Sequence, residues 1–212
     1  MGTIKQGILG GFSGKVGTVV GGSWKGISYM RSLAQNVKNP RTEAQMTQRS
    51  KFAIAIAFLK PITDYVRVGF KPYASKQTAF NAAMSYIVAN AISGEYPDHT
   101  LDFAKVLVSR GSLFPVDNAS AEVDAGKVTI SWTDNSGISD AFATDVAMPL
   151  VFNSLRGEAV FSTAAAARAD GLAEINLPAE WSGDPVQIYL GFVSQDGKAI
   201  ANSIYLGEKT LI

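Results

Sequence analysis

The segment Val128-Thr129-Ile130-Ser131-Trp132 decides the fold class of the second half of the chain. Its large apolar side chains alternate with hydroxyl side chains, which is the pattern of a strand buried on one face only. The same period of two recurs at residues 173–177 and 188–192. We therefore expect antiparallel strands here, and we predict that Trp132 is the core tryptophan.

Further strands are predicted on either side of this segment, at residues 105–109, 146–152, 158–161 and 203–206. Turn residues separate them at 134–137, 156–157 and 196–197. About seven short strands over a hundred residues are typical of an immunoglobulin-like or fibronectin type III-like β-sandwich. We predict such a sandwich at residues 119–212, with a small barrel as the alternative, and a linker with a first strand at residues 95–118.

Two helices are predicted before the strands. Asn39 can cap a helix that starts at Pro40 and ends near Leu59, with Glu43 close to the positive end of its dipole. A second helix is expected from Ser75 to Gly94. The apolar positions on which these helices depend are Ala44, Phe52, Ala55, Ile56 and Leu59 in the first, and Phe80, Ala83, Met84, Ile87, Val88 and Ala91 in the second.

The chain begins with a glycine-rich segment, since nine of its twenty glycines fall within the first 26 residues. Residues 16–20 and 23–31 flank Gly21-Gly22, a dipeptide suited to a two-residue hairpin loop. We predict a basic hairpin that must pack on other elements, because an isolated hairpin is marginally stable in water. The expected class is α+β, with residues 1–94 forming an assembly region of hairpin and two helices.

Charge is distributed unevenly along the 212 residues, whose net charge is only +1. Residues 1–80 carry twelve Lys/Arg and two Asp/Glu, whereas residues 81–212 carry seven Lys/Arg and sixteen Asp/Glu. One part is therefore strongly cationic and the other strongly anionic. Such polarity suits a basic module that binds an anionic partner, or a subunit whose basic end docks on the acidic end of its neighbour.

No catalytic constellation is found in the sequence. The chain has no cysteine, and His99 is its only histidine, so a zinc site or a Ser-His-Asp triad in the usual form is not expected. Gly14-Lys15 resembles a phosphate loop but lacks the required spacing and the following Ser/Thr. The oxygen-bearing residues of 134–140 depart from calcium-loop spacing, and we interpret them as a turn. We assign no catalytic residue, metal or cofactor.

Basic residues are interleaved with aromatic residues in the first part, a combination that can dock on an acidic protein or bind nucleic acid. In the first helix, Arg41, Gln45 and Arg49 recur every four residues on a stripe expected to face outward. The predicted interaction residues are Lys15, Trp24, Lys25, Tyr29, Arg31, Lys38, Arg41, Gln45, Gln48 and Arg49.

A resemblance covers about the first 90 residues. It rests on Gly11-Phe-Ser-Gly-Lys-Val-Gly17, on Trp24-Lys-Gly26 and on Asn39-Pro-Arg-Thr42 followed by Gln48-Arg49. The combination resembles an uncharacterised family of bacterial and phage-associated proteins. The resemblance implies no enzymatic activity, and it extends to phage structural proteins only weakly.

Together these patterns predict a non-enzymatic structural subunit, of virion or filament type, that self-associates through its basic N-terminal region. The alternative is a nucleic-acid-binding protein that uses the same region. The expected partners are copies of this chain or other structural subunits, with nucleic acid as an option. The longest apolar run, residues 52–59, is too short to span a bilayer. The start lacks a signal-peptide core, so we expect synthesis in the cytoplasm, with a virion as one destination.

Overall fold

The computed structural model describes residues 2–4, 7, 10–24, 26–35, 41–75, 77–124 and 126–211. The chain divides into two compact units, Met1–Arg41 and Thr42–Ile212. The mixed α+β class is confirmed. The boundary differs from the one predicted at residue 94, because the helices that follow Arg41 share a hydrophobic core with the strands of the second unit.

The first unit is a four-stranded antiparallel sheet of order β1-β2-β3-β4. Its strands are β1 (Thr3–Ile4), β2 (Phe12–Val16), β3 (Val19–Trp24) and β4 (Ile27–Ser32). The hairpin loop predicted at Gly21-Gly22 is wrong, since both glycines lie inside β3. They are strand residues because rings cover them: a Cβ on Gly21 would lie 2.6 Å from the Phe12 ring, and one on Gly22 would lie 3.0 Å from Tyr29.

The second unit begins with helices α1 (Glu43–Leu59), α2 (Thr63–Gly69) and α3 (Ala79–Asn90). The predicted start at Asn39-Pro40 is wrong: Arg41 has a φ of 44°, and the Thr42 hydroxyl accepts from Gln45 N at 3.4 Å as the N-cap. Asn39 and Pro40 themselves lie outside the described residues. Similarly, α3 starts after its cap Thr78 and not at Ser75. None of the helices in the described ranges is long and apolar enough to cross a membrane.

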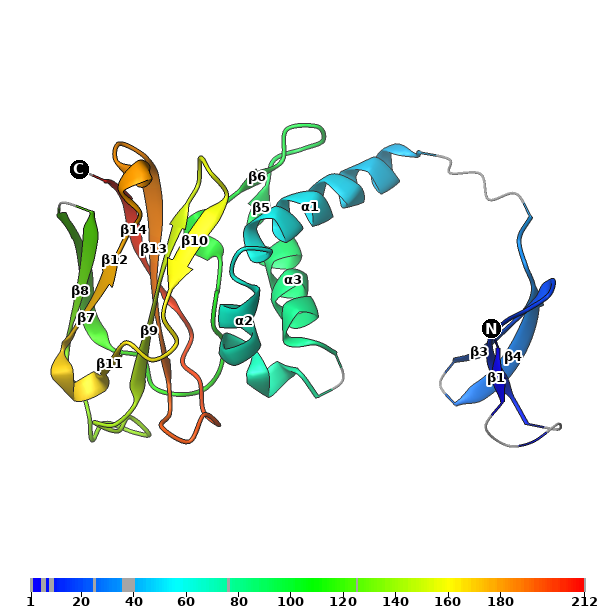
Figure 1. The fold of residues 1–212 in the computed structure, drawn as a ribbon, viewed down its shortest axis with the longest axis horizontal. Coiled ribbons are helices and arrows are strands. Elements are labelled where there is room, and N and C mark those ends of the chain that lie inside the picture. Colours follow the sequence, from blue (N-terminus) through cyan, green and yellow to red (C-terminus); the bar gives the residue numbers. More distant parts are fainter. Residues whose placement is uncertain are drawn as a thin grey trace. The chain divides into compact units, whose positions relative to one another are not determined.

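The rest of the second unit is built from antiparallel sheets (Figure 1). One sheet has the order β10-β9-β13-β14, with β11 also paired to β9, and the other has the order β12-β8-β7. A short ladder joins β5 to β6. The strands are β5 (Ile92–Ser93), β6 (Thr100–Leu101), β7 (Asp117–Asp124), β8 (Lys127–Thr133), β9 (Val146–Asn153), β10 (Glu158–Phe161), β11 (Ala166–Ala167), β12 (Leu172–Asn176), β13 (Pro185–Val193) and β14 (Ile204–Thr210).

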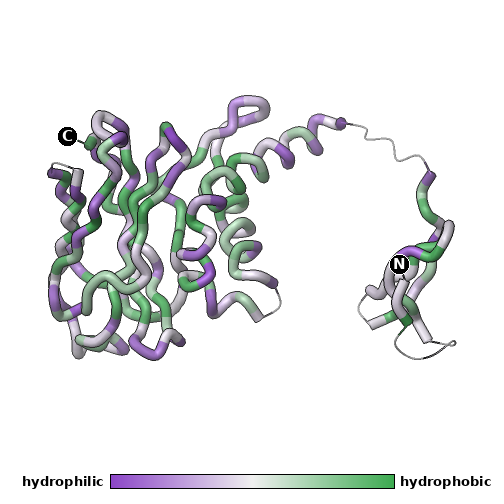
Figure 2. Tube along the Cα trace, viewed as in Figure 1, coloured by the Kyte–Doolittle hydropathy of each residue, from purple (hydrophilic) through white to green (hydrophobic). Residues whose placement is uncertain are grey.

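Strands β9 and β13 are buried on both faces, so the second unit has three layers (Figure 1). Met148 and Phe152 of β9 pack against the helices, whereas Ala147 and Val151 face the β12-β8-β7 sheet. On the helix side, the Tyr65 hydroxyl of α2 donates to Met148 O at 2.8 Å. Figure 2 shows hydrophobic residues concentrated on these central strands, between the two outer layers.

Most strands predicted in the second half are confirmed, and Trp132 is buried in the core between the two sheets. The strand predicted at residues 105–109 is wrong, because a 3-10 turn occupies Phe103–Lys105 and residues 106–109 belong to no strand. Val106 and Val108 are nevertheless fully buried. Their apolar pattern reflects core packing without strand pairing.

The apolar stripe predicted for α1 is only partly buried. Ala55 and Leu59 lie in the core together with Phe58, which the stripe did not include. Phe52 and Ile56 are 39 % and 44 % exposed. The helix therefore buries its C-terminal half and leaves part of its apolar surface uncovered.

Candidate functional site

The register of the first unit brings four predicted interaction residues to one face of its sheet. Lys15 lies opposite Val20, which lies opposite Arg31. Gly22 pairs with Tyr29, and Trp24 pairs with Ile27. Cross-strand partners project to the same side of a sheet, as do residues two apart on one strand. Lys15, Trp24, Tyr29 and Arg31 thus share one surface, which we call the cationic face.

The side chains of the cationic face are accessible. Trp24 is 64 % exposed and Tyr29 is 46 % exposed, and both Lys15 and Arg31 are exposed. Gly22 has no side chain, which lets the Tyr29 ring lie across β3. The face therefore combines two cations with two flat aromatic surfaces.

The opposite face of the same sheet carries exposed apolar side chains beside serines. Val16 pairs with Val19, and Met30 pairs with Gly21. Val16, Val19 and Met30 are all exposed, while the ring of Phe12 lies over Gly21. Among the described residues of this unit, only Gly21 is buried. The sheet therefore has no core of its own within the described part of the chain.

The remaining predicted interaction residues are not assembled into one stripe. Lys25 and Lys38 lie outside the described residues. Arg41 precedes α1 and belongs to the first unit, so it does not continue the helical stripe of Gln45 and Arg49. Gln45, Gln48 and Arg49 are exposed on α1, as expected. Gln48 also borders a groove of about 390 Å³ between α1 and α3, together with Phe52 and Met84.

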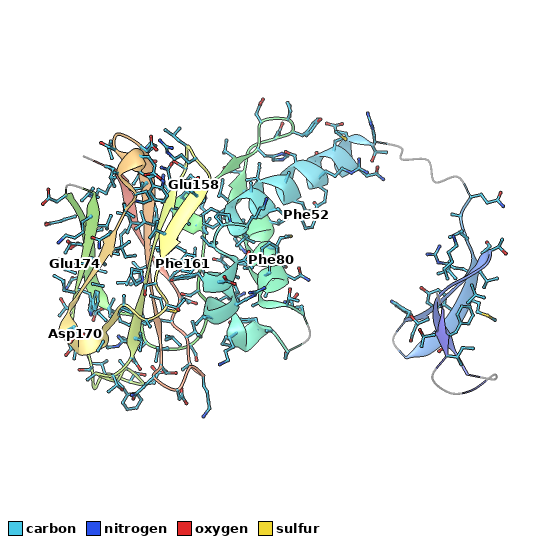
Figure 3. The ribbon with its side chains drawn as sticks, viewed as in Figure 1. Phe52, Phe80, Glu158, Phe161, Asp170 and Glu174 are labelled. Carbon is cyan, nitrogen blue, oxygen red and sulfur yellow. The ribbon has the colours of Figure 1, made fainter. Side chains whose placement is uncertain are left out.

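An acidic surface covers the outer side of the β12-β8-β7 sheet, away from the helices. Glu122 of β7 lies opposite Thr129 of β8, which lies opposite Glu174 of β12. Asp124 and Lys127 form the next pair on the same side. These residues define the acidic face, and Figure 3 shows Glu174 on that side of the second unit.

Ion pairing leaves part of the acidic face available. Lys127 contacts Glu174 at 2.7 Å, but Glu122 and Asp124 have no cation within 4 Å in the described part of the chain. Several carboxylates elsewhere on the unit are engaged locally. A hydrogen bond from Arg156, for example, lowers the pKa of Asp184, with a second from Asn153. The acidic face thus keeps two carboxylates that a cationic partner could contact.

The residues considered for metal or acid–base chemistry have structural roles. His99 is nearly buried, and its Nδ1 lies 3.2 Å from Ser50 Oγ. The Asp134 carboxylate accepts from the amide and hydroxyl of Ser136, as in an ordinary turn. In the ranges that the structure describes, no three His, Asp or Glu residues are grouped as ligands for a metal ion.

A buried ionic cluster was not anticipated from the sequence. Arg168 is fully buried and donates through Nε to Asp145 Oδ2 at 3.1 Å, through Nη1 to Asn135 at 2.8 Å and through Nη2 to Phe114 O at 2.9 Å. Its guanidinium also lies 4.6 Å from the centre of the Phe192 ring. The only local signal is that Arg168 follows four alanines at residues 164–167. The residues that its guanidinium contacts are distant in sequence.

Comparison with known families places the chain. Residues 11–207 match the model of DUF6266, a family of unknown function. The chain belongs to the DUF6266 family. No curated protein matches the sequence. The match extends from β2 of the first unit to β14 of the second, so strands β2, β3 and β4 of the N-terminal sheet are part of the DUF6266 pattern.

Proposed function

We propose that this protein is a non-enzymatic structural subunit that self-associates, with the cationic face of one copy docked on the acidic face of another. The observation that carries the proposal is that the N-terminal sheet buries almost none of its residues. Within Met1–Arg41 the described residues bury only Gly21, while large apolar side chains stand exposed on both faces. A sheet of this kind gains stability when another surface covers it.

The distribution of charge indicates which surface covers the N-terminal sheet. The segment Met1–Arg41 carries six Lys/Arg and no Asp/Glu. The remaining residues carry thirteen Lys/Arg and eighteen Asp/Glu. Opposite potentials on two surfaces steer their encounter and disfavour pairing of like surfaces. The acidic face, with Glu122 and Asp124 unpaired among the described residues, is complementary to the cationic face that holds Lys15 and Arg31.

A contact of this kind is heterologous, because two different surfaces of the same chain meet. Heterologous contacts generate rings when the rotation closes and open filaments when it does not. We therefore infer an assembly of virion or filament type.

We also propose that the strand-rich part is immunoglobulin-like. The pairing of β12 with β8 and of β13 with β9 supports this, since such cross-connections are typical of that sandwich.

The proposal is tested by the mass of the purified, nucleic-acid-free chain across a concentration series, using size-exclusion chromatography with light scattering. The wild-type protein is expected to form species larger than a monomer, with mass rising with concentration. Lys15→Glu combined with Arg31→Glu should give a monomer, because the docking surface loses its charge complementarity.

A matched control reverses two exposed cations of the second unit, Lys60→Glu with Lys209→Glu. This variant has the same net charge as the first and should assemble like the wild type. Two results would contradict the proposal: a wild-type chain that stays monomeric at every concentration, or loss of assembly in both variants alike. Electron micrographs of the wild-type assembly would then distinguish rings from filaments.

A second function, binding of single-stranded nucleic acid, is favoured by one feature of the same face. Trp24 and Tyr29 offer exposed rings beside Lys15 and Arg31, a combination that stacks bases and neutralises phosphates. Assembly is preferred because the chain itself supplies a surface of complementary charge, on which Glu122 and Asp124 have no cation within 4 Å among the described residues.

Tryptophan fluorescence tests the second function directly, because Trp132 and Trp181 are buried and Trp24 is exposed. Binding of an oligonucleotide of about ten nucleotides would quench the Trp24 emission. The affinity would also fall steeply with salt. Unchanged emission at low salt would exclude this function.

A further inference from the structure

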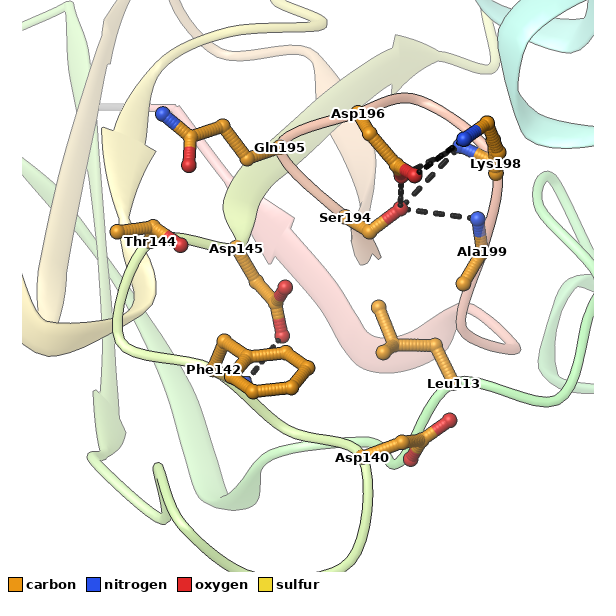
Figure 4. A pocket seen from close by; sticks show the side chains of 10 residues that line it. All are labelled: Leu113, Asp140, Phe142, Thr144, Asp145, Ser194, Gln195, Asp196, Lys198 and Ala199. Atoms are coloured by element: carbon orange, nitrogen blue, oxygen red, sulfur yellow. Dashed lines mark hydrogen bonds and ion pairs between the residues drawn. The ribbon is translucent and has the colours of Figure 1, made fainter.

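A cavity of about 470 Å³ lies at one end of the second unit, where three loops meet. The β8–β9 loop contributes Asp140, Phe142 and Asp145, the β13–β14 loop contributes Asp196 and Lys198, and Leu113 comes from the segment before β7. Its volume is in the range of small-molecule sites, which typically measure 300–1,000 Å³. Figure 4 shows the arrangement of these side chains around the open centre.

One carboxylate oxygen in this cavity has no partner. Asp145 is 1 % exposed, and its Oδ2 accepts from Phe142 N at 2.9 Å and from Arg168 Nε. Its Oδ1 is buried and accepts no hydrogen bond. Arg168 does not reach it, because the other guanidinium nitrogens bond Asn135 and Phe114. Buried acceptors are normally satisfied, so this oxygen indicates a missing donor.

Asp145 lines the cavity, so a molecule bound there is placed beside this carboxylate. The Asp145 carboxylate points into the space between Leu113 and Phe142 (Figure 4). No side chain that lines this space in the described structure donates to its Oδ1. A bound molecule with an N–H or O–H group would complete the hydrogen bonding.

Charge indicates that the donor is a cation. Arg168 neutralises Asp145, and Lys198 pairs with Asp196 at 3.2 Å. Asp140 accepts from Phe114 N at 2.9 Å but has no cation within 4 Å in the described residues. The cavity therefore keeps one negative charge, which favours a positively charged ligand over a neutral or anionic one.

The apolar residues that line the cavity indicate the chemistry of the rest of the ligand. Phe142 is 63 % exposed although it is a large aromatic residue, and Leu113 lies across the cavity from it (Figure 4). An aliphatic chain would cover both side chains, and an ammonium group beside an aromatic ring gains a cation–π attraction.

We propose that this cavity binds a protonated primary amine on an aliphatic chain. The ammonium group donates to Asp145 Oδ1 and is attracted by Asp140, while the chain packs on Phe142 and Leu113. This site is separate from the docking faces described above, and the assembly proposal does not depend on it.

The test titrates hexylammonium chloride into the full chain at neutral pH and follows backbone amide shifts by two-dimensional NMR. Saturable shifts are expected for Phe142 and Ala199, which line the cavity. The neutral isostere 1-hexanol should bind about tenfold or more weakly, because it lacks the charge that strengthens the hydrogen bond to a carboxylate. Hexanoate, with the opposite charge, should not bind.

Two variants localise the effect without touching the buried ion pair. Asp140→Asn removes the uncompensated charge and Phe142→Ala removes the exposed ring, and each should weaken hexylammonium binding several-fold. The control Glu95→Gln removes an exposed carboxylate between β5 and β6, outside the cavity and the docking faces, and should leave hexylammonium binding unchanged.

The proposal is overturned by any of three results. The first is the absence of a saturable shift with hexylammonium, which would mean that a buried water satisfies Oδ1. The second is binding of hexanol as tight as that of hexylammonium, and the third is an unchanged affinity in Asp140→Asn and Phe142→Ala. The last two outcomes would mean that the amine binds elsewhere or by its chain alone.

Discussion

Removing the carboxylate of Asp145 should destabilise the second unit strongly. The substitution Asp145→Ala leaves Arg168 fully buried without its counter-ion and deprives Phe142 N of its acceptor. Breaking a buried ion pair by deleting one partner costs about 3–5 kcal/mol, because an uncompensated charge remains in a low-dielectric interior. That is a large part of the roughly 5–15 kcal/mol by which folded proteins of this kind are stable.

Urea denaturation of the full chain measures this loss. With an m value of about 2 kcal/mol per molar urea, the midpoint should fall by about 2 M. Fluorescence is a suitable signal, because the Trp132 indole donates to Arg168 O at 2.8 Å and reports on this cluster. Both Trp132 and Trp181 are buried in the second unit, so they dominate the change on unfolding.

The matched control is an exposed ion pair whose N–O distance is shorter than that between Arg168 and Asp145. Arg67 contacts Asp64 at 2.6 Å, but their side chains are 70 % and 74 % exposed. Solvent screens such a pair, so Asp64→Ala should cost no more than about 1 kcal/mol. The comparison separates burial from distance. If Asp145→Ala costs no more than Asp64→Ala, the reasoning on the buried cluster is refuted.

Three further outcomes are expected. Tyr65→Phe should lower the free energy of unfolding by about 1 kcal/mol in chemical denaturation, since the buried hydroxyl donates to the backbone of β9. Burial also raises the pKa of Tyr65, so the stability of the wild-type protein should be steady below about pH 10 and fall above it. Hydrogen bonds, first of all the one from Ser194, lower the pKa of Asp196 from 3.8 to about 2, so an NMR titration should find its carboxylate ionised down to about that pH. The stabilising effect of this carboxylate should be present above pH 3.8 and lost as the pH falls toward 2. Gly191→Ala should lower the free energy of unfolding by about 1–3 kcal/mol, because a Cβ there would lie 2.6 Å from Ser109 Oγ. An unchanged midpoint in chemical denaturation would mean that the Ser109 side chain can move away.

Much of the strand architecture could be predicted from the sequence because β8 and β12 are half-buried. Their inner residues are apolar and their outer ones are polar except Leu172, so the period of two is visible at residues 128–132. The third layer could not be predicted in the same way. Strands β9 and β13 are apolar on both faces, and this pattern does not specify whether helices or another sheet cover them.

The wrong predictions arise where local pattern and tertiary packing differ. Gly21-Gly22 has the composition of a turn, yet these glycines accommodate the rings of Phe12 and Tyr29 within a strand. Phe52 and Phe58 are both on α1, but only Phe58 meets a partner across the layer, with Phe152 at 4.8 Å between ring centres. Helical periodicity indicates which residues share a face and not which face is covered.

The candidate surface was partly predictable. Basic and aromatic residues in the first part indicated an interaction region, but their common face depends on the register that sets Trp24 opposite Ile27. With the turn at Gly21-Gly22 that alignment would be lost, since a register shift of one residue moves side chains to the other face. The partners of Arg168 could not be predicted from the sequence, because residues 114, 135 and 145 meet only in the folded unit.

The central claim, that the cationic face of one copy docks on the acidic face of another, is tested most directly by mixing two complementary variants. The first carries Lys15→Glu and Arg31→Glu, and the second carries Glu122→Lys and Asp124→Lys. Sedimentation velocity should find each variant monomeric alone, because its two faces now have like charge. The equimolar mixture should assemble, since each face of one variant is again complementary to a face of the other. A mixture that stays monomeric, or a variant that assembles alone as the wild type does, would contradict the claim.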